Sequence, residues 1–313
     1  MSARAARRSG RRRALGLLAG ALVLGFLAWS VARGWDEVAA FDWDLRPGWL
    51  LVGLALLVLF YLGSAMGYAA AVAALYPRGP GAAVTADVWA RSLLGRYVPG
   101  NVLMVAGRVV LGAEAGIPRR VSLAATVYEQ VLALAAASVG GVIAVAAHGE
   151  VAGDAPLWLV ALVPLLVVPL HPRLFRPAAA WALARARREP LAAYLSARRV
   201  AALAGWYGVV AVLLAAGTWA LVRSAAGAEA GGPVEVGGGF LLAFTVSMLA
   251  FVFPSGLGVR EGAFALVLAA RLPNEVAIAV AVGTRLALTA VELAFVGAAA
   301  LAARAGRRRL RAA

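Results

Sequence analysis

The sequence of 313 residues contains no cysteine and no lysine, and only 14% of its residues are charged. Without cysteine, the chain has no disulfide, no thiolate metal site and no cysteine nucleophile. Without lysine, it has neither a Schiff base nor the Gly-x-x-x-x-Gly-Lys-Ser/Thr loop that binds nucleotide phosphates. A Gly-x-Ser-x-Gly nucleophile motif is also absent, and His148 and His171 have no set of metal-ligating partners around them in the sequence. We therefore expect that the protein is not an enzyme and holds no cofactor.

Apolar residues make up 63% of the chain, and its mean hydropathy is +0.85. Soluble domains average about 25% charged residues, so this composition indicates a polytopic membrane protein of the all-α class. A membrane-spanning helix needs about 20 apolar residues. Six runs approach or exceed that length: 14–31, 49–75, 121–147, 157–170, 200–222 and 275–303.

The first of these runs follows an arginine-rich start, as the apolar region of a signal peptide would. Its length of about 18 residues exceeds the usual signal-peptide core of roughly 7–15 residues. We therefore expect the run to be retained as the first span.

The formal net charge is +15, and all 30 basic residues are arginine. They cluster in the 1–13 tail, the 171–199 segment and the 304–313 tail, whereas the acidic residues fall mainly in the alternate loops. Cytoplasmic loops are enriched in basic residues, so we expect both termini in the cytoplasm and no binding of nucleic acid.

Residues 173–198 carry arginines among apolar side chains at helical spacing. This pattern predicts an amphipathic segment at the inner membrane surface, either bound to anionic headgroups or simply solvated.

Two further apolar stretches, 83–117 and 239–272, are interrupted by proline and glycine. The interrupting residues are Pro99, Gly100, Pro254, Gly256 and Gly258. Broken backbone at membrane depth is tolerated only against protein or a water-filled cavity. With six spans, the first stretch enters and leaves from the cytoplasmic side and the second from the outer side. We therefore expect two re-entrant helical hairpins that point at each other, an arrangement that transporters use near the bilayer midplane.

Charged residues inside apolar elements are costly and usually mark a pathway or a binding site. Those of this chain are Arg108, Glu129, Arg260, Glu261, Arg285 and Glu292. In the functional interpretation, Arg108 and Arg260 bind an anion, because a guanidinium donates two parallel hydrogen bonds to phosphate oxygens. In the structural interpretation, the six charges form ion pairs that fix the helix packing. Arg285 and Glu292 lie seven residues apart, which is about two helical turns, so we expect each to pair with another element.

Two candidate residues have more than one possible role. Arg96 is either a first contact for the anion or a charge that sets topology near the interface. Glu129 balances an arginine, carries a proton or accepts hydrogen bonds from freed backbone N–H groups. We count both as candidate substrate-binding residues, together with the other buried charges and the interrupting prolines and glycines.

Three segments resemble the signature blocks of a known family. They are Arg96-Tyr97-Val98-Pro99-Gly100-Asn101-Val102 continuing to Ala106-Gly107-Arg108, the segment around Glu129, and Pro254-Ser255-Gly256-Leu257-Gly258-Val259-Arg260-Glu261-Gly262. With the apolar pattern over 14–303, the chain resembles the lysylphosphatidylglycerol synthase transmembrane region family, also called flippase-like domain proteins. The resemblance implies a multi-pass protein of the prokaryotic plasma membrane that moves lipid headgroups between leaflets. Bifunctional members carry a separate cytosolic synthase domain; the sequence to Ala313 shows none, so we expect no synthase activity.

The main hypothesis is a translocase for an anionic or polyprenyl-phosphate-type lipid, whose tails stay in the bilayer. Since no ATP-binding motif is present, movement is expected to be facilitated or ion-coupled, with Glu129 or Glu292 as the candidate proton carrier. The alternative is a non-transporting membrane partner that scaffolds a glycosyltransferase or a lipid synthase. A third possibility, an enzyme acting on lipid phosphates, lacks a recognisable catalytic set.

Overall fold

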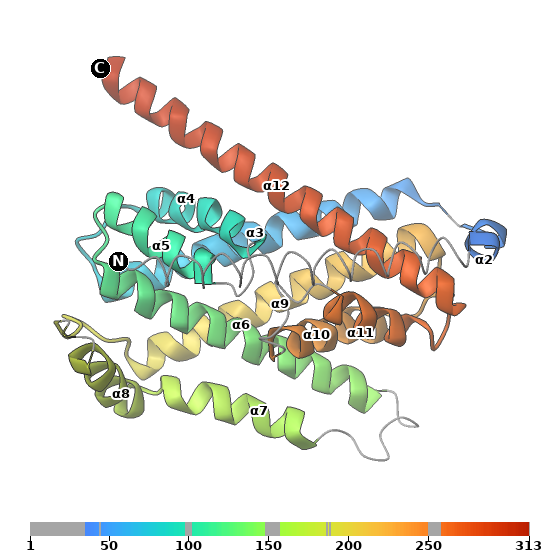
Figure 1. Ribbon diagram of the computed structural model, residues 1–313, viewed down its shortest axis with the longest axis horizontal. Helices are drawn as coiled ribbons and strands as arrows, with labels where there is room; N and C mark the ends of the chain where they lie inside the picture. Colours follow the sequence, from blue (N-terminus) through green and yellow to red (C-terminus); the bar gives the residue numbers. More distant parts are fainter. Residues whose placement is uncertain are drawn as a thin grey trace, which may run out of the picture.

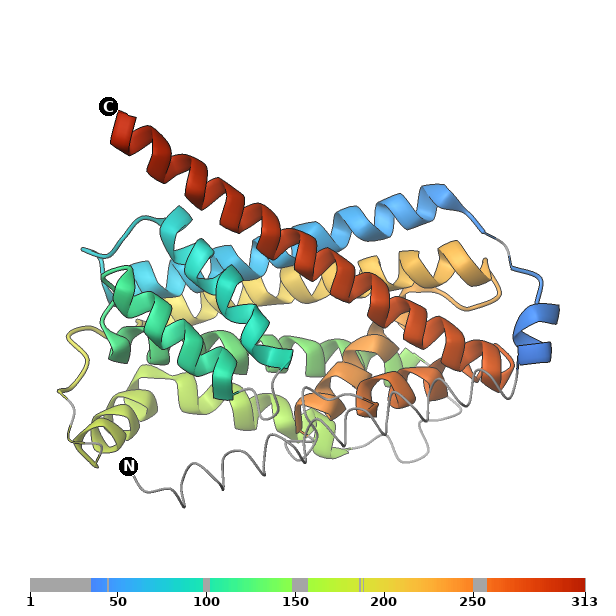
Figure 2. The same cartoon turned by 45° about the horizontal axis from the view of Figure 1, so that its top comes forward.

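The computed structural model describes residues 35–43, 45–97, 102–147, 157–185, 187, 189–249 and 258–312, which are mainly helical and form no strand. The elements are α2 (Trp35–Ala40), α3 (Pro47–Leu75), α4 (Ala82–Ser92), the 3-10 helix η1 (Leu93–Tyr97), α5 (Val102–Glu114), α6 (Arg119–Ala147), α7 (Leu157–Val167), the 3-10 helix η3 (Val168–Leu170), α8 (Pro172–Arg185), α9 (Ala197–Ala226), α10 (Pro233–Leu249), α11 (Val259–Leu268) and α12 (Asn274–Ala312). Figures 1 and 2 show them as one elongated bundle.

Four of the described helices are long and apolar enough to cross a membrane. They are α3, α6, α9 and the Asn274–Ala302 part of α12. The spans expected at 49–75, 121–147, 200–222 and 275–303 therefore correspond to helices of membrane-crossing length. The span expected at 14–31 lies outside the described residues.

The span expected at 157–170 is bent where it ends. Its helical part, Val160–Leu170, meets Pro172–Arg185 at an angle of 70°. Proline disfavours helical backbone in the residue before it, and His171 is extended, with ψ 135°. If this bent pair counts as one span, the described chain has up to five spans.

The amphipathic helix expected after this bend is shorter than the pattern of 173–198 suggested. The helix α8 ends at Arg185, and the described residues from Glu189 to Tyr194 are not helical. Pro190 provides the physical reason, because proline lacks the N–H that a helix needs and restricts the residue before it. No described residue of α8 is buried, and Trp181 is 69% exposed.

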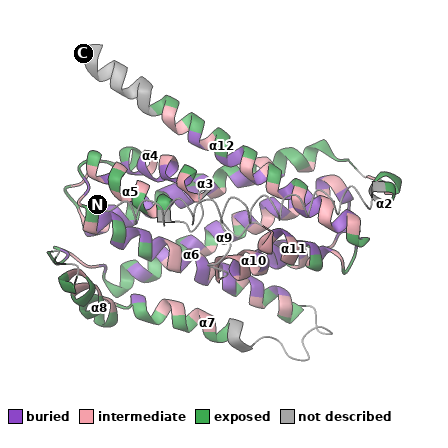
Figure 3. Cartoon of the chain, in the orientation of Figure 1, coloured by how far each residue is buried: buried purple, intermediate pink, exposed green. Residues whose placement is uncertain are grey.

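The long helices pack through small residues. A Cβ added at Gly67 of α3 would lie 2.7 Å from the Tyr207 hydroxyl of α9, and one added at Gly238 of α10 would lie 2.5 Å from Ala144 of α6. Small residues let membrane helices approach closely. Figure 3 shows the buried residues on the facing sides of these helices and the exposed residues on the outer sides.

The two interrupted stretches form short helices at opposite ends of the bundle. Figures 1 and 2 place α4 and α5 toward one end, and α10 and α11 toward the other. The breaks themselves, with Pro99, Gly100, Pro254 and Gly256, lie outside the described residues. The side chains next to the breaks are described, and they border the same cavity.

Candidate functional site

A cavity of about 350 Å³ with several charged lining residues, here called the charged chamber, lies among the helices of the bundle. Its lining comes from α3, α4, η1, α5, α6, α9, α10, α11 and α12. The charged lining residues are Arg96, Glu129, Arg260, Arg285 and Glu292. Arg96 stands just before the first break and Arg260 just after the second, so the two interrupted stretches converge on one chamber.

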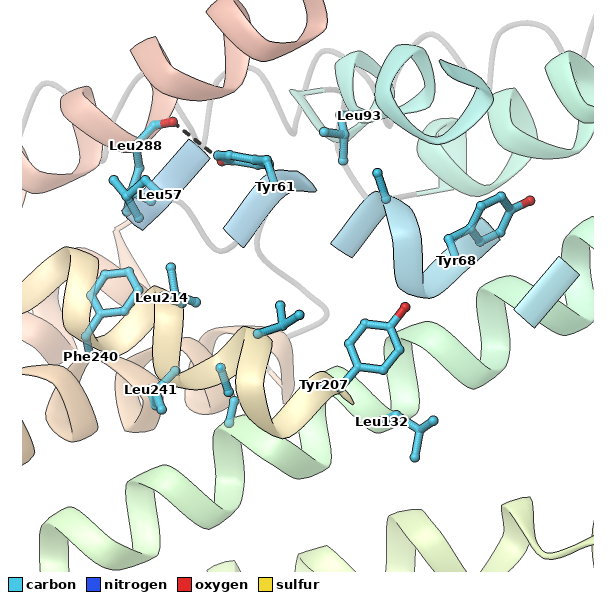
Figure 4. Close-up of a cluster of buried hydrophobic side chains, with 14 of the residues drawn as sticks. Leu57, Tyr61, Tyr68, Leu93, Leu132, Tyr207, Leu214, Phe240, Leu241 and Leu288 are labelled. Carbon is cyan, nitrogen blue, oxygen red and sulfur yellow. Dashed lines mark hydrogen bonds between the residues drawn. The ribbon is translucent and has the colours of Figure 1, made fainter. Parts of the chain in front are cut away.

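One side of the chamber is an ion pair between η1 and α12. Arg96 Nη1 lies 2.6 Å from Glu292 Oε2, and the same oxygen accepts a hydrogen bond from the Tyr61 hydroxyl at 2.9 Å. Figure 4 shows Tyr61 reaching from α3 toward Leu288 of α12, whose carbonyl is 3.5 Å from the tyrosine oxygen. The Arg96 side chain is 31% exposed, and that of Glu292 is 4% exposed. Arg96 is thus tied to α12 and borders the chamber at the same time.

A second side is built at the N-terminus of α11. Gly258 precedes the helix with φ 83°, a backbone conformation that favours glycine. Glu261 turns back, and its Oε2 accepts a hydrogen bond from the Gly258 N–H at 2.7 Å. Its other oxygen, Oε1, lies 3.5 Å from Arg260 Nη2 and 3.5 Å from Arg285 Nε. One carboxylate therefore faces two guanidinium groups, one from α11 and one from α12.

Arg108 lies in a closed environment beside the chamber. Its side chain is 0% exposed and forms an ion pair with Glu129. Its Nε donates to the Ser92 hydroxyl at 3.0 Å, and its guanidinium carbon lies 4.9 Å from the centre of the Tyr68 ring. Glu129 also accepts a hydrogen bond from the Trp89 indole N–H at 2.7 Å. Arg108 is not among the described residues that line the chamber, whereas its partner Glu129 is.

The structure therefore divides the predicted site residues into groups. The chamber brings together Arg96, Glu129, Arg260, Arg285 and Glu292, with Glu261 behind the two arginines. Arg285 and Glu292 each pair with another element, as their spacing predicted. Gly258 shapes the start of α11.

Several polar residues of the chamber were not predicted from the sequence. They are Tyr61, Ser64, Trp89, Gln130, Tyr207, Ser247 and Thr289. None stands out in the sequence, because single polar or aromatic residues are common along apolar helices. The Gly258-x-x-Glu261 spacing is a usable signal, since a glutamate three residues after a helix N-cap commonly bonds back to it.

An apolar groove of about 680 Å³ lies beside the chamber, lined by residues of α6, α7, α9 and α10. Ala211 and Leu241 belong to the walls of both cavities. Among the described residues, no three His, Cys, Asp or Glu side chains are grouped as metal ligands would be. The arrangement offers charge-assisted hydrogen bonds to an anion, next to a surface suited to hydrocarbon.

The helices and the charged chamber define a multi-pass membrane protein of the helical-bundle class with buried charges. Among protein families, the family model of the lysylphosphatidylglycerol synthase TM region matches residues 14–295 of the chain. The chain belongs to this family, which confirms the resemblance found in its sequence. A search of curated proteins finds no match.

Proposed function

We propose that this protein is a lipid translocase that moves an anionic lipid headgroup between the leaflets of the membrane. The observation that carries the proposal is the chamber, where Arg96, Arg260 and Arg285 converge from η1, α11 and α12. A lipid phosphate that leaves water needs charge-assisted donors, and arginine provides them in a fixed planar fork. The chain also belongs to a family named after the membrane region of a lipid synthase, and this supports a lipid-related role.

The apolar groove supports the same proposal. A headgroup in the chamber and hydrocarbon tails in or beside the groove would share a wall at Ala211 and Leu241. The headgroup then meets charge while the tails stay in an apolar environment, which lowers the cost of crossing. Glu292 and Glu129 line the chamber and are the candidate carriers of a coupled proton.

The direct test is leaflet exchange by the purified protein in liposomes, across a panel of labelled lipids. The unaltered protein should accelerate the exchange of an anionic lipid. Arg260→Ala should abolish this acceleration, and Arg260→Lys should leave little of it, because lysine offers a point charge in place of a fork. The matched control is Arg271→Gln, whose arginine is 53% exposed and pairs with Glu235 away from the chamber lining.

A second candidate function is a membrane scaffold for a glycosyltransferase or a lipid synthase. The observation in its favour is that Arg96, Arg108, Arg260 and Arg285 each lie within ion-pair distance of a carboxylate. A scaffold predicts no leaflet exchange by the pure protein and tolerance of Arg260→Lys in a folded variant. Exchange that depends on the arginine fork would exclude a purely scaffolding role.

We also propose that both termini face the cytoplasm, on the basis of the arginine clusters in the two tails. Because the chain has no cysteine, single cysteines at positions 2 and 312 can be labelled without background. An impermeant thiol reagent applied to intact cells should label neither. Labelling of either position from outside would contradict this orientation and the opposed hairpins that depend on it.

A further inference from the structure

We infer that the charged chamber selects a headgroup with a single negative charge, a phosphodiester, and that this charge lies between Arg260 and Arg285. The inference rests on the proposed function and adds the class of substrate and the place where it binds. It follows from the count of charges in and behind the chamber, and from how loosely one group of them is paired.

The charge count leaves one guanidinium in excess. Among the described residues, the ion pairs of the chamber and its immediate surroundings involve four arginines and three glutamates. They are Arg96, Arg108, Arg260, Arg285, Glu129, Glu261 and Glu292. By sequence, segments 98–101 and 250–257 carry no ionisable side chain and add no charge to this count.

The excess charge is located at the start of α11. Arg96 and Arg108 each have their own carboxylate, and both of those contacts are direct hydrogen bonds. Arg260 and Arg285 instead share Glu261 at 3.5 Å each, which is longer than the roughly 2.7–2.9 Å of a charge-assisted hydrogen bond. The buried atoms Arg260 Nη2 and Glu261 Oε1 have no hydrogen-bond partner among the described residues, and the same holds for Arg108 Nη2 and Glu292 Oε1. The Arg260–Arg285 corner differs from the other two pairs in its longer ion-pair contacts and in having both guanidinium groups in the chamber lining, so we assign the further group to this corner.

The corner is open to the chamber rather than sealed. The side chains of Arg260 and Arg285 are 13% and 17% exposed and both line the chamber, whereas that of Arg108 is 0% exposed. An oxyanion placed between the two guanidinium groups would supply the acceptor that Arg260 Nη2 lacks. Glu261 would keep its bond to the Gly258 N–H through its other oxygen.

The size of the excess sets the charge of the ligand. One negative charge neutralises the group, whereas a doubly charged phosphomonoester leaves a buried negative charge, which is costly without a partner. A zwitterionic headgroup brings an ammonium for which the corner has no separate carboxylate. A phosphodiester carries a single negative charge, and it occurs both in phosphatidylglycerol and in hexosyl polyprenyl phosphates.

The test measures leaflet exchange of four labelled lipids by the purified protein in phosphatidylcholine liposomes. The probes are phosphatidylglycerol, a hexosyl polyprenyl phosphate, phosphatidate and phosphatidylcholine. At least one of the two lipids with a net single negative charge, phosphatidylglycerol and the hexosyl polyprenyl phosphate, should exchange about tenfold or more faster than phosphatidate and the zwitterionic phosphatidylcholine, and the faster one identifies the source. Phosphatidylcholine or phosphatidate exchanging as fast as both singly charged lipids would overturn the inference.

Two single variants change the charge count, and the double variant restores it. Arg285→Gln removes the excess, so phosphodiester exchange should fall roughly 10- to 100-fold. Glu261→Gln raises the excess to two and should shift the preference toward phosphatidate. The double variant Arg285→Gln with Glu261→Gln has an excess of one again and should recover phosphodiester exchange. If this variant is folded, by its thermal unfolding, but no better than Arg285→Gln, the inference is wrong.

A second readout separates this inference from the proposed function. Short-chain phosphatidylglycerol should raise the thermal unfolding temperature of the detergent-solubilised protein, but not that of Arg285→Gln, because a ligand that binds only the folded state stabilises it. Stabilisation without any leaflet exchange would support the binding site and contradict the translocase. Exchange with no preference among headgroups would support the translocase and contradict the charge selectivity.

Discussion

Two groups of buried charges, made from the same residue types, differ in how they are satisfied. Arg108 and Glu129 form a one-to-one pair, closed by Ser92, Trp89 and the Tyr68 ring. Arg260 and Arg285 share one carboxylate at a longer distance and border the chamber. Removing one partner of a close buried ion pair leaves an uncompensated charge, whereas a loosely paired cluster can exchange a partner for a ligand. We therefore expect the first group to stabilise the bundle, and we propose the second as the binding group.

The largest expected effect breaks the closed pair. Arg108→Ala leaves Glu129 buried without its guanidinium, which should lower the free energy of unfolding by about 3–5 kcal/mol. Unfolding in detergent, followed by helical circular dichroism, measures this change. Adding Glu129→Gln should restore much of the loss, because the remaining group is then neutral. A variant as stable as the unaltered protein would show that the pair does not hold the bundle together.

A smaller effect is expected when only one hydrogen bond of the closed pair is removed. Trp89→Phe keeps the aromatic ring but removes the indole N–H that donates to Glu129. Leaving a buried carboxylate oxygen without its donor should cost about 1–3 kcal/mol, measured by the same unfolding experiment. Trp181→Phe is the matched control, because that tryptophan is 69% exposed.

For the group of Arg260, Arg285 and Glu261, we expect a substitution to affect lipid exchange more than stability. Arg285→Ala leaves Glu261 with Arg260 and with the Gly258 N–H. The expected loss of stability is only about 0.5–1.5 kcal/mol, whereas lipid exchange should be lost. A loss of stability as large as that of Arg108→Ala would remove the contrast between the two groups.

The smallest effect concerns a third pair, on the surface. The hydrogen bond from Arg120, and then its charge, lower the pKa of Glu189 below its ordinary value of 4.5. A lowered pKa in the folded state means that the pair contributes stability above the ordinary glutamate pKa and loses it as the pH falls through the lowered one. Because Glu189 is 82% exposed at its side chain, Arg120→Ala should leave the unfolding midpoint near neutral pH almost unchanged. A clear drop in the midpoint would show that this surface ion pair contributes more to stability than such pairs usually do.

The comparison also shows how far the candidate site could be predicted. The cost of charge in an apolar element identified Arg108, Glu129, Arg260, Glu261, Arg285 and Glu292, and the structure places all of them in or beside one region. From the sequence, we predicted the same anion-binding role for Arg108 and Arg260. In the structure, Arg108 is fully buried, whereas Arg260 lines the chamber. Hydropathy cannot separate these cases, because both residues follow a Pro-Gly or Pro-Ser-Gly interruption in similar apolar surroundings.

The sequence by itself determined the class of the protein, the four long spanning helices and the family, because these depend on composition, run length and short local motifs. The run at 157–170 was also recognised from the sequence, but its bend at His171 was found only in the structure. Only the tertiary structure decided which arginine meets which glutamate. Arg96 and Glu292 are 196 residues apart in sequence, and their contact depends on how η1 and α12 pack, which no local pattern encodes. Two arginines around one carboxylate, the arrangement on which the proposed lipid selectivity depends, exist only once α11 and α12 are brought together.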